Sequence, residues 1–160
     1  MDIKPKAFVR LLPFAFLLHN AEEVLAFAKG YTNIEPPFTI GQFAVATLLF
    51  TTLGFVVVFA KSVYNNPRYC YIIAGFAGML FLNSFFPHLI LTLVTRSYSP
   101  GVLTAMCLQM PLSFMVLYNL NRQEIMQGKT LVLSAIAGGL CGAVLVPVFL
   151  GAGWLFMLIF

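Results

Sequence analysis

The chain has 160 residues, of which 61% are hydrophobic and only 9% are charged, and it contains 17 phenylalanines. This composition excludes an ordinary soluble globular domain and indicates a multi-pass membrane protein. The formal net charge is +4, but the basic residues are scattered between apolar runs, which argues against a nucleic-acid-binding surface.

Five apolar stretches of the sequence are candidate membrane spans, because crossing the hydrocarbon region takes roughly 20 apolar residues in a helix. They cover residues 7–28, 39–60, 69–95, 100–120 and 130–160. The connectors between them are short and carry Pro, Gly or Asn. At 1.5 Å per residue the last stretch reaches about 45 Å, and Pro147 is expected to kink it. We therefore predict an all-α, compact bundle of five transmembrane helices that forms a single domain over residues 1–160.

The distribution of basic residues predicts the orientation of the chain. With five spans the termini lie on opposite sides of the membrane, and loops rich in Lys and Arg stay in the cytoplasm. One side carries Lys4, Lys6, Arg10, Lys61, Arg68, Arg122 and Lys129, and the other carries Lys29 and Arg96. We expect a protein of the cell membrane with its N-terminus in the cytoplasm and its C-terminus outside.

The first span contains three ionisable residues, which are costly in a membrane unless they are neutral, paired or bound to an ion. His19, Glu22 and Glu23 stand at positions i, i+3 and i+4, so a regular helix presents all three on one face. Imidazole nitrogen and carboxylate oxygen are common ligands of zinc, iron and manganese. The group therefore predicts a divalent metal site. A simpler interpretation is that both glutamates are solvated at the outer end of the helix.

The third span carries the second histidine of the chain, His88. His88 lies about 28 Å from the cytoplasmic start of its helix, and His19 to Glu23 lie about 18 to 24 Å from the cytoplasmic start of the first span. Both sets therefore lie at a similar depth, in the outer half of the bundle. His88 is therefore predicted as a further metal ligand. Asn83 precedes it by five residues and would point about 140° away on a regular helix. Either Pro87 distorts this turn and restores a shared face, or Ser84 takes the facing position.

The fourth span begins after Tyr98-Ser99-Pro100-Gly101. Proline suits the first turn of a helix, and glycine permits close approach of another backbone. Gln109 then lies about 13 Å inward, near the level of Asn83. Polar groups from three spans are thus expected to converge at one level.

These residues form three motifs that resemble those of the HXXEE family of small bacterial membrane proteins. The resemblance covers roughly residues 10–125 and leaves the C-terminal helix, 130–160, outside it. The family carries Asn-x-x-x-His and Tyr-x-Pro-Gly besides the motif for which it is named. His19-Asn20-Ala21-Glu22-Glu23 and Tyr98-Ser99-Pro100-Gly101 match, whereas Asn83 and His88 are five apart rather than four. The resemblance implies a site but no particular reaction.

Our leading hypothesis is an intramembrane metalloenzyme of hydrolase or isomerase type. The metal ligands are drawn from His19, Glu22, Glu23 and His88, with one glutamate free to act as a general base on a metal-activated water. Tyr98 or Asn83 would polarise a substrate oxygen. The apolar surroundings predict a hydrophobic or lipid-like substrate, for which we assign Gln109, Ser84 and Arg96 to binding.

Two other classes of function remain open. The same carboxylates and imidazoles would serve a proton- or cation-coupled transporter of small molecules. A non-catalytic membrane accessory subunit would dock within the bilayer through small residues such as Ala135, Gly139 and Ala143. Packing inside the bundle is the simpler use of that row, and a homo-oligomer is the alternative.

Overall fold

The computed structural model describes residues 7–32, 37–61 and 68–159, and this part of the chain is helical and contains no strand. The helices, with η marking π-helical segments, are α1 (Ala7–Ala28), α2 (Ile40–Phe59), α4 (Tyr69–Asn83), η1 (Ser84–Leu89), α5 (Ile90–Thr95), α6 (Val102–Thr104), η2 (Ala105–Gln109), α7 (Met110–Arg122) and α8 (Gly128–Ile159). Lys4 and Lys6, used above to orient the chain, lie outside the described residues.

These segments join into five rods, each long and apolar enough to cross a membrane: α1, α2, the rod from α4 to α5, the rod from α6 to α7, and α8. The predicted all-α bundle is confirmed, and each predicted span agrees with its rod to within two residues. Pro147 lies inside α8, which continues through it as one helix of 32 residues.

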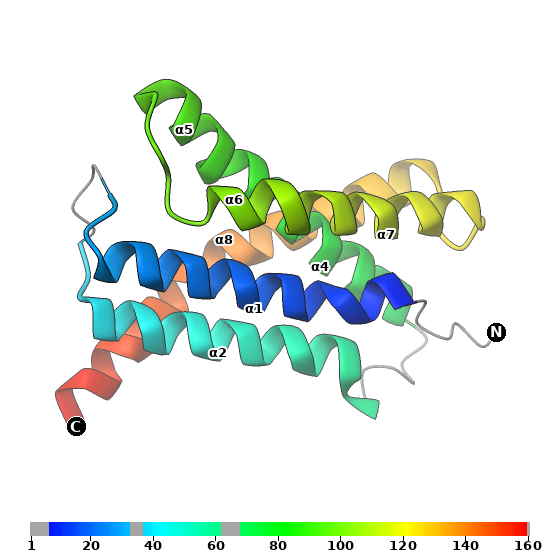
Figure 1. Cartoon of the computed structure of the whole chain (residues 1–160). Helices are drawn as coiled ribbons and strands as arrows, with labels where there is room; N and C mark the ends of the chain where they lie inside the picture. The colour runs from blue at the N-terminus through cyan, green and yellow to red at the C-terminus, as the bar shows by residue number, and fades with distance from the viewer. Residues whose placement is uncertain (1–6, 33–36, 62–67, 160) are drawn as a thin grey trace.

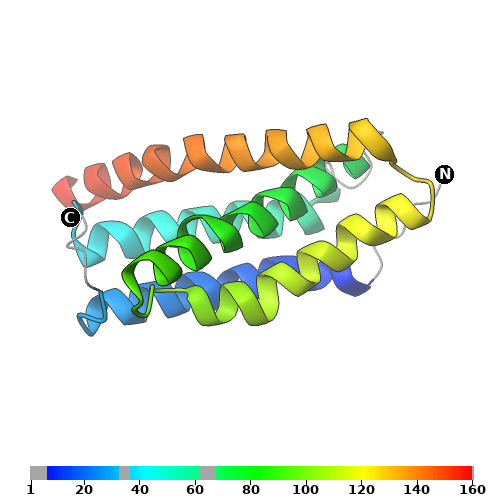
Figure 2. The same cartoon turned by 90° about the horizontal axis from the view of Figure 1, so that it is seen from above.

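The rods lie roughly along one direction, with α1 beside α2 and α8 packed on α4 and α2 (Figure 1). In Figure 1 the rod from α4 to α5 and the helix α8 run obliquely to α1 and α2, whereas from above the rods run roughly along one direction (Figure 2). The beginning of α1 and the end of α8 lie at opposite ends of the bundle. This is the arrangement expected of an odd number of antiparallel spans.

Glycines allow α8 to approach α4 closely. A Cβ atom on Gly138 would collide with the backbone of Gly75, and one on Gly78 would collide with Ala135. Small residues at such crossings let helix backbones approach in a membrane, where dispersion contacts rather than water exclusion hold helices together. At these positions the small residues of α8 therefore pack within the chain.

The bundle has an apolar core and a separate cluster of buried polar residues. Leu12, Ile73, Leu80 and Val116 are buried in the core. Nearer the C-terminal end of α1 the buried side chains become polar: His19, Asn20, Ser84, His88, Ser99 and Gln109. One of them joins α1 to α2, since Asn20 Nδ2 donates to Thr51 Oγ1 at 2.7 Å.

Candidate functional site

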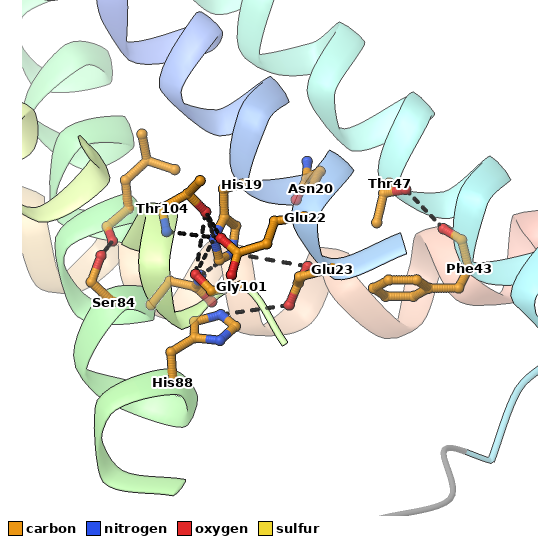
Figure 3. Close-up of polar contacts among 12 residues, drawn as sticks. His19, Asn20, Glu22, Glu23, Phe43, Thr47, Ser84, His88, Gly101 and Thr104 are labelled. Atoms are coloured by element: carbon orange, nitrogen blue, oxygen red, sulfur yellow. Dashed lines mark hydrogen bonds and ion pairs between the residues drawn. The ribbon is translucent and has the colours of Figure 1, made fainter. Parts of the chain in front are cut away.

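Two histidines and one glutamate meet where α1 faces η1. His19 and Glu23 stand one turn apart on α1, and His88 points toward them from η1 (Figure 3). His88 Nε2 lies 3.5 Å from Glu23 Oε1, and His19 Nε2 lies 3.9 Å from Glu23 Oε2. One ligand atom from each residue lies within 4.8 Å of the others, and we call this set the donor group. Both histidines are at most 2% exposed.

The ring of His19 is oriented by the chain that precedes α6. Its Nδ1 lies 3.1 Å from the carbonyl oxygen of Gly101, which can only accept a hydrogen bond, so Nδ1 carries the proton. In this tautomer Nε2 carries the lone pair of the ring, which faces Glu23 and accepts a hydrogen bond from Asn83 Nδ2 at 3.3 Å. A histidine that donates its other ring N–H to a backbone carbonyl is the usual arrangement of a metal ligand.

The contact between His19 and the backbone at residue 101 requires a glycine there, both for its conformation and for the space around it. Its φ of +84° lies in the left-handed region that favours glycine. A Cβ atom added there would lie 2.6 Å from His19 Cε1 and 2.8 Å from Glu23 Cγ. The sequence therefore places its glycine where the backbone supports two members of the donor group.

Glu22 is not a member of the donor group and caps the rod that begins at α6. Its carboxylate accepts hydrogen bonds from the backbone N–H groups of Leu103 at 3.3 Å and Thr104 at 2.8 Å. It also accepts from Thr104 Oγ1 and Tyr98 Oη, both at 2.6 Å. These N–H groups belong to the first turn of a helix, where a negative charge is stabilising. Burial, reinforced by the bond to Glu22, raises the pKa of Tyr98 to about 12, so its hydroxyl stays a donor.

A break in helical geometry brings His88 to the site. η1 contains a kink between two helical turns, because Phe86 inside it has an extended backbone with φ −126° and ψ 118°. Side chains before and after Phe86 therefore do not follow regular helical spacing. Asn83 and His88 consequently line the same cavity, and Asn83 Nδ2 lies 3.3 Å from His19 Nε2. Ser84 instead donates to the Leu80 carbonyl of its own helix at 2.9 Å. Of the two alternatives, the distorted turn is the one that the structure adopts.

The donor group opens on a cavity of about 180 Å³. Besides the donor group, Asn20 and Asn83, its wall is mostly apolar and includes Phe16, Phe50, Val146, Phe149 and Leu150. A ligand that reaches the donors therefore meets hydrocarbon on its other sides.

Comparison with known proteins identifies the family of this chain. The family model described as "Protein of unknown function with HXXEE motif" matches residues 10–116. The chain belongs to the HXXEE family. It is 29% identical over 150 residues to the uncharacterized protein YrkK of Bacillus subtilis (strain 168). The aligned stretch covers 91% of this chain and 95% of YrkK. No solved structure matches the chain.

The residues of the HXXEE motif thus lie in two different settings. His19 and Glu23 enter the donor group with His88, whereas Glu22, predicted as a further metal ligand, is held by four hydrogen bonds at the start of α6. Tyr98, predicted to polarise a substrate, bonds to Glu22 and does not reach the donors in this structure.

The residues assigned to substrate binding lie apart from the HXXEE donors. Gln109 is fully buried in η2, its amide has no hydrogen-bond partner among the described residues, and it does not line the cavity beside the donors. Arg96 ends α5 in the left-handed conformation and is exposed, and in the described part of the chain no hydrogen bond or ion pair joins it to the site.

Sequence reasoning missed Thr104, which donates to Glu22 through both its backbone and its hydroxyl. Its Oγ1 also lies 3.2 Å from His19 Nδ1. Thr104 lies three residues beyond the Tyr-x-Pro-Gly motif, and nothing in its apolar surroundings marks it. Only the approach of α6 to α1 reveals its role.

Proposed function

We propose that this HXXEE protein binds one divalent metal ion through His19, Glu23 and His88 and uses it for hydrolase- or isomerase-type chemistry on a hydrophobic or lipid-like substrate. The observation that supports the proposal is the donor group itself: two buried imidazoles and a carboxylate with their ligand atoms within 4.8 Å, contributed by two different rods. A bound dication would offset the cost of placing this carboxylate in the membrane.

The donor set fits zinc, iron or manganese. Two histidines and one carboxylate with open positions are the protein ligands of many catalytic zinc sites and of non-haem iron(II) sites. Bonds of about 2.1 Å at tetrahedral angles place ligand atoms about 3.4 Å apart. The separations of 3.5 and 3.9 Å to the Glu23 oxygens are close to that requirement.

The chain supplies orientation around this position. The Gly101 carbonyl fixes the His19 ring, and the Asn83 amide borders the cavity, where it can hydrogen-bond a substrate oxygen. Four hydrogen bonds occupy the Glu22 carboxylate, so we assign Glu22 to positioning α6 rather than to proton transfer. When bound, the metal would act as a Lewis acid and lower the pKa of a coordinated water.

We place the protein in the cell membrane with the beginning of α1 in the cytoplasm. The described basic residues support this orientation, because five of them lie at or beyond rod ends on that side and only Lys29 and Arg96 lie on the other. The five on the cytoplasmic side are Arg10, Lys61, Arg68, Arg122 and Lys129. The donor group then lies in the outer half of the bilayer.

Metal content tests the proposal directly. Detergent-purified protein is incubated with zinc, iron(II) or manganese, desalted and measured by inductively coupled plasma mass spectrometry. We expect close to one ion per chain, lost in a His19→Ala/Glu23→Ala double variant and retained in Glu124→Ala, which changes an exposed glutamate after α7. A native chain that retains none of the three metals would overturn the proposal.

Proton or cation passage is the second candidate, and one observation favours it. Gln109 and Ser113 are fully buried one turn apart, with side-chain polar atoms that have no hydrogen-bond partner in the described part of the chain. They lie on the rod that runs from Gly101 toward the opposite end of the bundle. Proton flux into liposomes that is abolished in Gln109→Leu would support a carrier, and its absence in the native chain would exclude proton passage.

A further inference from the structure

The cavity beside the donor group is the first of three neighbouring hollows along α8. A second hollow of about 450 Å³ shares Phe16, Phe50, Asn83, Pro87 and Val146 with it. A third, of about 600 Å³, shares Phe50 and Met79 with the second and extends to Arg68 at the start of α4. We call these three neighbouring hollows, which share lining side chains, the α8 groove. From Arg68 to Asn83 the helix rises about 22 Å, which gives the approximate length of the groove.

The α8 groove is apolar and borders the bilayer. Glycines 75, 138, 139 and 142 line it, where α8 and α4 lie in close contact. Leu82, Phe86 and Leu140 line it and are also exposed at the surface of a rod that spans the membrane. A molecule that enters the groove therefore comes from the hydrocarbon of the membrane rather than from water.

The groove is polar at one end. The donor group and Asn83 line the end near η1, and the lining beyond Asn83 is apolar until Arg68, Tyr71 and Ser134. Phe50 borders all three hollows and Met79 borders two, so these side chains stand between neighbouring hollows, and a ligand that fills all three must displace them. A row of hollows of this form suits one hydrocarbon chain with a polar group at one end.

We propose that the α8 groove binds a single-chain lipid, with its oxygen-bearing head at His19, Glu23 and His88 and its tail directed toward the start of α4. This inference rests on the proposed metal site, because a metal held by the donors would attract the head. The half-thickness of the hydrocarbon region is about 15 Å, so a groove of about 22 Å accommodates an extended lipid tail.

Photoaffinity labelling of the full chain tests the location and the direction of the lipid. Zinc-loaded protein in phosphatidylcholine nanodiscs is irradiated with palmitic acid that carries a diazirine either at its methyl end or beside its carboxylate, and the adducts are mapped by mass spectrometry. We expect the methyl-end probe to label the third hollow, near Met79 and Cys141, and the carboxylate-end probe to label the wall near Asn83 and Phe86. Excess unmodified palmitic acid should suppress both.

Two neighbouring substitutions on α8 provide a matched comparison. Ala143 lines the second hollow, whereas Val144 is 64% exposed and lines none of the three. We expect Ala143→Phe to fill the groove and reduce methyl-end labelling by about tenfold or more, and Val144→Phe to leave it unchanged. Zinc binding should persist in both variants, which also shows that they fold.

Each result separates the lipid site from the metal site. Zinc binding with adducts scattered over exposed residues of α8, with the two ends reversed, or with equal labelling of Ala143→Phe and Val144→Phe would overturn the lipid site and leave the metal proposal standing. The positions of the adducts and their suppression by unmodified palmitic acid are measured on the native chain. The test therefore holds even if Ala143→Phe does not fold. Groove labelling without zinc binding would instead overturn the metal proposal and the placement of the head that depends on it.

Discussion

Glu22 and Glu23 are neighbours in the sequence, but the fold gives them different partners. Glu22 accepts hydrogen bonds from Tyr98, Leu103 and Thr104, whereas Glu23 faces two imidazoles. Consecutive helical residues point about 100° apart, so adjacent carboxylates can serve two neighbouring elements. The paired glutamates of the motif are thus one group that caps a helix and one that can bind an ion.

Conservative substitutions should separate these two functions. Glu22→Gln keeps an acceptor but removes the charge, so we expect the free energy of unfolding to fall by about 1–2 kcal/mol while metal binding persists. Glu23→Gln should lower metal affinity by more than about a hundredfold, beyond what loss of a ligand's hydrogen-bond partner usually costs. Thermal unfolding and zinc titration measure the two effects. The reverse pattern would show that Glu22 is the metal ligand.

Gly101→Ala should damage the site more than its backbone conformation alone predicts. The new methyl group would lie against His19 Cε1 and Glu23 Cγ, in addition to the strain of a φ of +84°. Gly128→Ala is the matched control, because Gly128 has a φ of +53° and nothing within 4 Å of its Cβ position. Both variants should lose about 1 kcal/mol of stability to backbone strain, but only Gly101→Ala should weaken zinc binding. Equal zinc affinity in the two variants would contradict the contact.

Tyr98 should make the protein more sensitive to alkaline pH. Its pKa of about 12 in the folded chain is above the ordinary value of 10, so the folded state holds this proton more tightly than the unfolded state. The stability it contributes is complete below pH 10 and is lost as the pH rises toward 12. The free energy of unfolding should fall more steeply between pH 9 and pH 12 for the native chain than for Tyr98→Phe. Parallel profiles would show that the hydroxyl does not support Glu22.

The limits of the five rods could be predicted from the sequence because apolar length sets them. The common depth of His19 and His88 also followed, since a helix rises by a fixed distance per residue and both spans run the same way. The sequence left open whether the turn at Phe86 is regular or distorted, because a helix that contains Pro87 can adopt either geometry. Tertiary packing, which no local pattern records, selects between them.

The predicted site was less complete than the predicted fold. Motif spacing predicted that His19, Glu23 and His88 lie together, as they do. It did not predict that Glu22 bonds to the start of α6, because residues three and four positions apart share one face of a regular helix. The contact between Glu22 and Thr104 spans 82 positions of sequence and depends on how α6 docks. Such a contact has no signature in a single sequence.

The approach of α8 to α4 depends on glycine and offers a test at this interface. Gly138→Leu would drive a side chain into the backbone at Gly75, so α8 must move or the rods must separate. We expect the free energy of unfolding to fall by about 1–3 kcal/mol or more, the usual cost of overpacking. Gly151→Leu, at a position of α8 with open space around its Cβ, should cost much less. Similar melting temperatures for the two variants would show that this contact does not hold α8.

The donor group connects rods that are far apart along the chain. His19 and Glu23 lie on α1, His88 lies on the third rod, and the Gly101 carbonyl holds His19 from the start of the fourth. In a membrane, lipid competes with apolar side chains for contact, so apolar packing alone gives a weaker preference for one arrangement. A bound ion would therefore connect the first and third rods and stabilise the whole bundle.

Metal removal should accordingly destabilise the entire molecule. An ion that binds only the folded state contributes about 2.7 kcal/mol when its free concentration is a hundred times its dissociation constant. We expect the melting temperature in detergent to fall on addition of a chelator, to recover with zinc, and to be insensitive to both in Glu23→Ala. Hydrogen exchange should show which parts loosen: if the ion joins the first and third rods, protection near His19 and His88 falls together. A loss confined to one of them would mean that the ion does not connect the two rods.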